Sequence, residues 1–350
     1  MNKKYLIITA SYGDGHNAAK NGIKNYLEEK GDIVQVFDYF ADMIEAKEFT
    51  QSFYKFCSER YPILRKSIYK MLLFHTSQKI FKKYFTSKYS KGFNKIINDF
   101  NPDYIISVFP YSQYFVGHYK ENHNLHFKHG VLVTDSAIHL SWYFEDKYID
   151  KFFVIDDNTK DSLIKKLPHR KDDIITTFFP IENKYFVDKE KLNNKTITIL
   201  LTGFTYEFSK RLLDRLSLEK FYEKIIIIKG RNDYVYNKLE NEVKNEKFEY
   251  TTYLKIKEEL KNIDIFISKP GGALVSECVA QDTYMITPFY IEGQEKENID
   301  FLERNNLGFH TVSTHKIIEF LKEGYKNINL LNFKKIKNKN AIKDIIDNLK

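Results

Sequence analysis

The segment Ile263-Asp-Ile-Phe-Ile-Ser-Lys-Pro-Gly-Gly272 contains the pattern that decides the fold. It begins with an isoleucine-rich run typical of a short buried strand, passes through a turn of small residues, and leads into the helical pattern of residues 273–280. A strand, a tight turn and a helix N-terminus together form an anion site that suits a diphosphate. Glu277 lies about one turn into this helix, where its carboxylate can accept hydrogen bonds from ribose hydroxyls. The segment therefore predicts a nucleotide-binding unit.

The same order of strand, glycine turn and helix occurs near the N-terminus. Residues 5–10 are an apolar run, Ser11-Tyr-Gly-Asp-Gly-His16 follows, and residues 16–30 have the periodicity of a helix. Gly13 and Gly15 permit a tight turn whose backbone can approach a ligand closely. We therefore expect a second ligand-binding turn here.

Three interpretations fit this N-terminal turn. Gly13-x-Gly15-x-x-Ala18, with Asp38 about 20 residues further on, matches the dinucleotide fingerprint of an NAD-dependent oxidoreductase. His16 instead favours transfer to a hydroxyl group, because that chemistry needs a base with a pKa near neutrality. The third interpretation is a structural turn in which His16 only caps the helix.

Short apolar runs alternate with amphipathic stretches along the chain, which predicts βα units and largely parallel sheets. We expect an α/β protein with two Rossmann-like domains that face each other across a cleft. The expected divisions are an N-terminal domain at 1–179, a linker at 180–195, a C-terminal domain at 196–330 and a basic helix at 331–350. The predicted strands are residues 5–10, 33–37, 104–108, 131–134, 152–155, 197–201, 225–228, 263–267 and 284–287.

Composition excludes several classes of protein. Cys57 and Cys278 are far apart and outside any CxxC spacing, which disfavours a disulfide framework or a zinc ribbon and suits a reducing compartment. No stretch approaches the roughly 20 apolar residues that span a bilayer, so we expect a soluble or monotopic protein. The histidines at positions 118, 123, 126 and 129 match no metal-ligand template, and we expect no metal site.

The segment between Lys47 and Lys95 concentrates positive charge in a chain of net charge +8. It holds twelve Lys and Arg residues, two acidic residues and twelve Phe and Tyr residues, within a strand-free region, 42–100, that predicts inserted helices. An ordinary solvated helical face, a nucleic-acid site and a pair of helices on an anionic membrane surface all fit this composition. We favour the membrane surface and expect no nucleic-acid partner.

Two motifs in the second half resemble a known family. Lys269-Pro-Gly-Gly-x-x-x-Ser-Glu277, followed by Glu292-Gly-Gln-Glu-x-x-Asn298, resembles the donor-site signature of glycosyltransferase family 28. The likeness is strongest to monogalactosyldiacylglycerol synthases and processive diacylglycerol glucosyltransferases. Further segments that look like motifs of these enzymes are Ser11-Tyr-Gly-Asp-Gly-His16, Thr134-Asp-x-x-x-His139-x-x-Trp142, Phe179-Pro-Ile181 and Lys229-Gly-Arg-Asn232.

The resemblance implies a GT-B fold and an inverting, metal-independent transfer of glucose or galactose from a UDP-sugar to a membrane lipid, with diacylglycerol as acceptor and no cofactor. It also implies a peripheral or monotopic protein at the cytoplasmic face of the cell membrane. His16 is our first choice of base, and Asp135 is the second, with His139 as its orienting partner. Gly13, Gly15 and Trp142 belong to the implied acceptor side. The implied donor-binding residues are Gly203, Arg231, Gly271, Gly272, Glu277, Gln294, Glu295 and Asn298.

Two further alternatives stay open. A transferase that uses a polyprenyl-linked cell-wall precursor shares the fold and the donor motif. A non-catalytic membrane-binding protein would use the basic aromatic segment alone.

Overall fold

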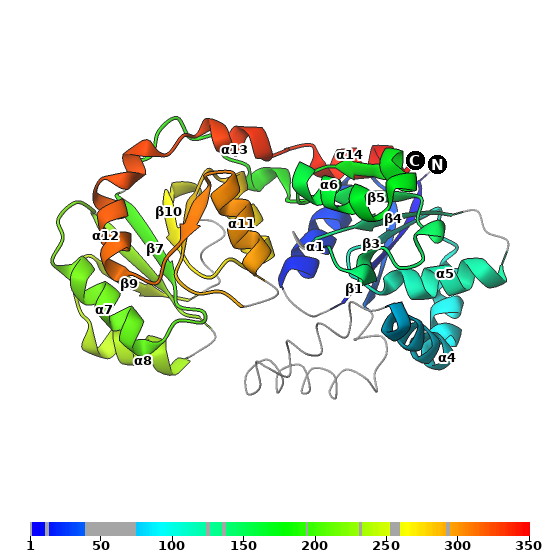
Figure 1. Ribbon diagram of the computed structural model, residues 1–350, viewed down its shortest axis with the longest axis horizontal. Coiled ribbons are helices and arrows are strands. Elements are labelled where there is room, and N and C mark those ends of the chain that lie inside the picture. The colour runs from blue at the N-terminus through cyan, green and yellow to red at the C-terminus, as the bar shows by residue number, and fades with distance from the viewer. Residues whose placement is uncertain are drawn as a thin grey trace. The chain divides into compact units, whose positions relative to one another are not determined.

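The computed structural model describes residues 2–10, 14–38, 75–123, 127–134, 138–193, 195–230, 233–252, 260–291 and 295–350. The chain forms two compact units, the first made of Met1–Glu182 with Lys339–Lys350 and the second of Asn183–Asn338 (Figure 1). Each unit contains a six-stranded parallel sheet with helices, so the predicted α/β class is confirmed.

The sheet of the first unit has the strand order β2-β1-β3-β4-β5-β6. Its strands are β1 (Lys4–Thr9), β2 (Ile33–Asp38), β3 (Tyr104–Ser107), β4 (Lys128–Leu132), β5 (Lys151–Val154) and β6 (Ile174–Thr176). Its helices are α1 (Asp14–Glu29), α4 (His75–Phe100), α5 (Ser112–Asn122), α6 (Asp157–Lys166) and α14 (Ala341–Leu349). Short 3₁₀ turns are η1 (Leu140–Trp142), η2 (Asp146–Tyr148) and η3 (Pro168–Asp173). The order of the strands reverses between β1 and β3.

The sheet of the second unit has the order β12-β11-β10-β7-β8-β9. Its strands are β7 (Thr196–Leu200), β8 (Lys224–Ile228), β9 (Phe248–Thr251), β10 (Ile265–Ile267), β11 (Tyr284–Thr287) and β12 (Gly308–His310). Its helices are α7 (Tyr206–Ser217), α8 (Asp233–Glu242), α10 (Gly272–Ala280), α11 (Lys296–Arg304), α12 (Thr314–Lys322) and α13 (Leu331–Ile336). Here the reversal lies between β10 and β7. In open parallel sheets, ligands bind outside the carboxyl ends of the strands at such a reversal.

Central strands of both sheets are buried on both faces, which explains their near-continuous apolar sequences. In β1 the residues after Lys4 are all buried, and in β8 the residues from Ile225 to Ile228 are buried. Three strands were not predicted, namely β6, β9 and β12. All three form edges of the sheets, and their three or four residues are less buried than the central strands.

The C-terminal tail differs from the single helix expected at 331–350. It forms α13 in the second unit and α14 in the first, with an extended residue, Lys337, after α13. Buried Ile342, Ile345, Ile346 and Leu349 face the first unit, where α14 contacts α1, β4 and β5 (Figure 1). The tail therefore completes the helical cover of the first sheet.

A buried ion-pair network fastens the segment after residue 182 and the tail to the second sheet. Lys337 Nζ lies 2.6 Å from Asp282 Oδ1 and 2.9 Å from Asp188 Oδ1. Lys189 Nζ lies 3.3 Å from Asp264 Oδ1. Asp264 directly precedes β10, and Asp282 lies just before β11. The network therefore lies at the amino ends of these strands, on the opposite edge of the sheet from the carboxyl ends where ligands bind.

The predicted helical insertion at 42–100 is described only in its last part, where α4 runs from His75 to Phe100. Residues 39–74 lie outside the described part of the chain. No helix in the described ranges has both the length and the apolar character needed to cross a bilayer.

Candidate active site

His16 occupies the strand reversal of the first sheet. It lies in the first turn of α1, the next described element of the chain after β1. Its Nδ1 atom is 2.8 Å from the backbone oxygen of Val108, which follows β3, and 3.1 Å from Oγ1 of Thr134, which follows β4. The imidazole at the start of α1 therefore contacts the segments that follow β3 and β4.

These contacts determine the tautomer of the neutral His16 ring. A carbonyl oxygen only accepts hydrogen bonds, so Nδ1 of His16 carries the proton that is donated to Val108. The lone pair of the neutral ring then lies on Nε2. Nε2 is thus the ring nitrogen that can accept a proton, if His16 acts as the base predicted from the sequence.

Aromatic rings surround His16. The ring of Phe109 meets it edge-on at a centroid distance of 5.4 Å, and the fully buried Trp142 lies at 6.4 Å. The ring of His139 also contacts Trp142, with the two ring centroids 6.1 Å apart. The structure thus brings together three predicted residues, His16, His139 and Trp142, and Gly15 directly precedes His16 in the first turn of α1.

The loop after β3 is strained next to this cluster. Tyr111 has a φ of 78°, in the left-handed region that bulky residues rarely adopt. Its backbone nitrogen lies 3.4 Å from the backbone oxygen of Ser141, and its ring packs on Phe109 and Tyr114. Such strain persists where surrounding packing fixes the backbone, and it concentrates at functional sites.

The strand reversal of the second sheet brings two further loops together. Gly203 follows β7 with a φ of 79°, and a Cβ atom built there would lie 3.4 Å from Cδ of Lys269, which follows β10. Gly230, after β8, has no room for a side chain, because a Cβ would lie 2.6 Å from the backbone nitrogen of Thr202. Gly203 therefore supplies a left-handed backbone conformation, and Gly230 lets the loops at this edge approach closely.

Two side-chain contacts join the two halves of the donor motif. Nδ2 of Asn298 donates to the backbone oxygen of Pro270 at 2.8 Å. Glu295, only 5% exposed, forms an ion pair with Lys269 through Oε1 and accepts from the backbone nitrogen of Ile291 at 2.7 Å through Oε2. Residues about 28 positions further along the chain thus hold the turn at residues 269–272, which we call the clamped turn.

The clamped turn leads directly into α10. Gly271 is the N-cap residue, and it has no side chain with which to occupy the first amides of the helix. Glu277 lies partly buried further along α10. The ammonium of Lys269, which is paired with Glu295 and partly exposed, lies in the turn before the helix N-terminus, where anions are favoured.

Four predicted site residues lie outside the described part of the chain: Gly13, Asp135, Arg231 and Gln294. The sequence analysis also assigned no role to Lys269, although Lys269 is the cationic residue of the motif Lys269-Pro-Gly-Gly272. The contacts of Val108 and Thr134 with His16 could not be found from the sequence, because they arise from the pairing of strands far apart in the chain.

Of the histidines near β4, His129 has a structural environment. It is fully buried, its Nε2 lies 2.9 Å from Ser107 Oγ, and its Nδ1 lies 3.2 Å from the backbone oxygen of Tyr148. Burial, aided by the charge of Lys120, lowers the pKa of His129 to about 3. Over the described ranges, no group of three or more His, Cys, Asp or Glu side chains is arranged to hold a metal ion.

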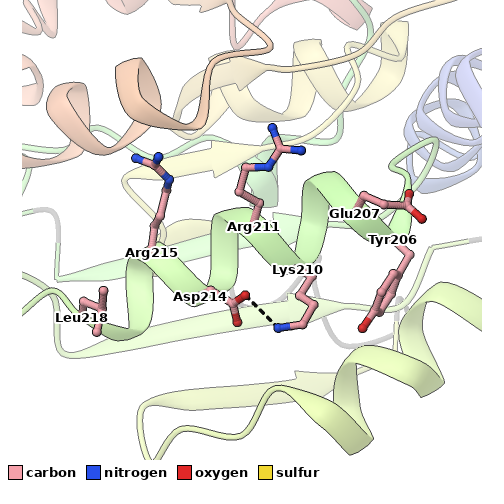
Figure 2. A pocket seen from close by; sticks show the side chains of 7 residues that line it. All are labelled: Tyr206, Glu207, Lys210, Arg211, Asp214, Arg215 and Leu218. Atoms are coloured by element: carbon pink, nitrogen blue, oxygen red, sulfur yellow. Dashed lines mark hydrogen bonds and ion pairs between the residues drawn. The ribbon is translucent and has the colours of Figure 1, made fainter.

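A shallow hollow on the surface of α7 contains none of the predicted site residues (Figure 2). Figure 2 shows Arg211 and Arg215 pointing to one side of the helix, while Lys210 and Asp214 form an ion pair of 2.7 Å on the other. The hollow is lined by Tyr206, Glu207, Lys210, Arg211, Asp214, Arg215 and Leu218.

Comparison with known proteins identifies related enzymes. The family model of monogalactosyldiacylglycerol (MGDG) synthase matches residues 16–181. A processive diacylglycerol beta-glucosyltransferase of Staphylococcus carnosus (strain TM300) is 26% identical, over 95% of this chain and 87% of that protein. This chain is homologous to the diacylglycerol glycosyltransferases. A second such enzyme, from Bacillus pumilus (strain SAFR-032), is 27% identical over 86% of this chain and 81% of its own length.

This chain shares its fold with solved glycosyltransferases. The crystal structure of the glycotransferase of kitacinnamycin superposes with a TM-score of 0.64, at 8% identity and over 100% of both chains. The predicted GT-B fold is therefore confirmed, and the relatives support the prediction of a hexosyltransferase that resembles the diacylglycerol glycosyltransferases. The relatives give no support to the NAD-dependent alternative.

Proposed function

We propose that this chain transfers a hexose, glucose or galactose, from a UDP-sugar to diacylglycerol in a membrane. The observation that carries the proposal is the clamped turn at residues 269–272, which lies at a strand reversal in a chain whose relatives are named diacylglycerol glucosyltransferases. The neighbouring helix N-terminus and Lys269 suit the diphosphate of such a donor.

The second unit binds the donor in this proposal. Backbone amides at Gly271 and Gly272 bond the phosphates, and Glu277 accepts from the ribose hydroxyls. Lys269 and the N-terminus of α10 stabilise the negative charge that develops on the departing UDP. Glu295 and Asn298 act by holding this turn, through the contacts described above. The remaining donor contacts are assigned to Gly203, Arg231 and Gln294.

The first unit supplies the base. The hydroxyl oxygen of the lipid attacks C1 of the sugar, and the bond from C1 to the diphosphate oxygen breaks with its electron pair leaving on UDP. The hydroxyl proton passes to Nε2 of His16, and attack from the opposite face inverts the anomeric centre. A general base typically contributes about 10²–10⁴-fold. Asp135 is the second candidate for this role.

We assign the membrane contact to α4, with the protein bound peripherally at the cytoplasmic face. Ile80 and Tyr84 are 64% and 54% exposed, although both are hydrophobic. The same helix also exposes lysines near these two side chains, including Lys79 and Lys83. A basic helical face with exposed apolar side chains binds anionic lipid, and each Lys near the surface adds about 1 kcal/mol.

The test is transfer to vesicles that contain diacylglycerol. The full-length chain is incubated with UDP-glucose or UDP-galactose, UDP release is measured, and the lipids are analysed by mass spectrometry. A hexosyl-diacylglycerol product formed together with UDP supports the proposal. Failure of both sugars, in a protein whose melting temperature responds to NADH and not to UDP, would contradict it.

A further inference from the structure

A chain of buried polar side chains connects α4 and α5 to His139. The hydroxyl of Tyr114 donates to Oε1 of Gln78, and Nε2 of Gln78 donates to Oγ of Ser141 at 3.4 Å. Oγ of Ser141 lies 3.0 Å from Nδ1 of His139. Gln78, Tyr114 and Ser141 are each 0% exposed, so the chain is shielded from water.

The backbone of Ser141 is held as firmly as its side chain. Its carbonyl oxygen accepts a hydrogen bond from Nε2 of Gln113, which is also 0% exposed. Ser141 belongs to η1, the turn that carries Trp142, and Trp142 contacts both His139 and His16. Ser141 thus stands at the junction between α4 and the predicted acceptor side.

The chemistry of the groups fixes the direction of these hydrogen bonds. An amide nitrogen only donates, so Ser141 Oγ accepts from Gln78, and the single hydroxyl proton needs another acceptor. Among the described residues, Nδ1 of His139 is the acceptor in contact with that hydroxyl. A buried hydroxyl without an acceptor is costly, so Ser141 donates to Nδ1 of His139. The proton of the neutral His139 ring then lies on Nε2.

The two histidines next to Trp142 therefore have opposite tautomers. His16 donates from Nδ1 to Val108 and has its lone pair on Nε2, whereas His139 accepts at Nδ1 and has its N–H at Nε2. We propose that Gln78 is a positioning residue that acts through Ser141 to hold His139 in the Nε2–H tautomer, so that His139 donates to a substrate oxygen while His16 accepts the proton. The catalytic part of this statement rests on the proposed function.

The tautomers are measured without any substrate. Two-bond nitrogen–proton correlation spectra of the full chain, labelled with ¹⁵N-histidine, distinguish Nδ1–H from Nε2–H rings, and loss of a signal in His139→Gln assigns it. We expect Nε2–H at His139 in the wild type. Ser141→Ala removes the donor, and Gln78→Met removes the amide that orients it, so both variants should shift His139 toward Nδ1–H.

Thr86→Val is the matched control on α4, because the hydroxyl of Thr86 bonds the backbone oxygen of Lys82 within the helix at 2.8 Å. It should leave the tautomer of His139 and the turnover unchanged. Ser141→Ala should lower kcat with little change in the KM for the UDP-sugar. An Nδ1–H signal for His139 in the wild type would overturn the proposal, as would a tautomer that does not change in Ser141→Ala.

Inactivity of the wild type toward lipid and UDP-sugar would count against the proposed function alone, because the spectra report the tautomer independently of turnover. The expected tautomer together with unchanged kcat in Ser141→Ala would overturn the donor role of His139.

Discussion

Asn298 donates a hydrogen bond from Nδ2 to the backbone oxygen of Pro270 at 2.8 Å, which joins the start of α11 to the turn that precedes α10. Both residues belong to motifs recognised in the sequence, but their spacing gave no reason to expect this contact. The bond explains why an amide is suited to position 298: it holds the turn whose backbone amides are proposed to bind the diphosphate.

Asn298→Ala should weaken UDP binding about tenfold, because the turn loses the side chain that holds Pro270. Titration calorimetry with UDP measures the effect. Asn305→Ala is the matched control, since Asn305 is the C-cap residue of α11 and its Nδ2 donates to the backbone oxygen of Phe301 at 2.8 Å. Equal UDP affinities in the two variants would contradict the role given to Asn298.

Lys269→Gln should reduce the affinity for UDP about tenfold and leave the affinity for uridine nearly unchanged. The ammonium of Lys269 acts on phosphate charge, which uridine lacks. Lys296→Gln, which removes an exposed lysine paired with Asp300, serves as the control. The assignment of Lys269 to the diphosphate is wrong if both ligands lose affinity by the same factor.

The buried network at the opposite edge of the second sheet should dominate the stability of that unit. Asp282→Ala removes the buried one of the two carboxylates that pair with Lys337, while Asp188 remains, and we expect a loss of about 1–3 kcal/mol in the free energy of unfolding. Asp300→Ala, which breaks an exposed pair on α11, should change it by less than about 0.5 kcal/mol. Urea unfolding followed by fluorescence compares them, and similar losses would refute the difference.

Acid should destabilise the first unit through His129. The pKa of this residue is about 3 in the folded chain against 6.5 for an ordinary histidine, so between these values the unfolded chain binds a proton that the folded chain does not. The free energy of unfolding therefore falls as the pH is lowered from 6.5 toward 3, by up to about 1.4 kcal/mol per pH unit. Urea unfolding as a function of pH should show a shallower slope for His129→Gln than for the wild type.

His315→Gln is the control for that measurement, because the side chain of His315 is 76% exposed. Its stability should follow the wild-type pH dependence. Parallel curves for the wild type and His129→Gln would show that the buried neutral imidazole is not the cause.

Much of the fold could be predicted because the central strands of parallel sheets are nearly continuous apolar runs. Each predicted strand corresponds to one in the structure, with shifts of a few residues at its ends, as in β4, which begins at Lys128. The edge strands β6, β9 and β12 were missed because half-buried short strands have no such run. The break of the tail at Lys337 was missed because its cause is tertiary, namely the ion pairs of that lysine with Asp188 and Asp282.

The candidate site could be predicted where chemistry is encoded locally, as in the glycine turn with His16 and the turn before α10. The contacts that orient those residues could not. Val108, Ser141 and Gln78 are ordinary in sequence, and only the pairing of strands and the packing of α4 bring them to the histidines.

The most direct test of the account is the turnover of His16→Ala with vesicles that contain diacylglycerol, measured as UDP release and lipid product together with calorimetric UDP affinity. We predict that turnover falls about 10²–10⁴-fold while UDP affinity stays nearly that of the wild type. Turnover equal to that of the wild type would contradict the assignment of His16 as the base.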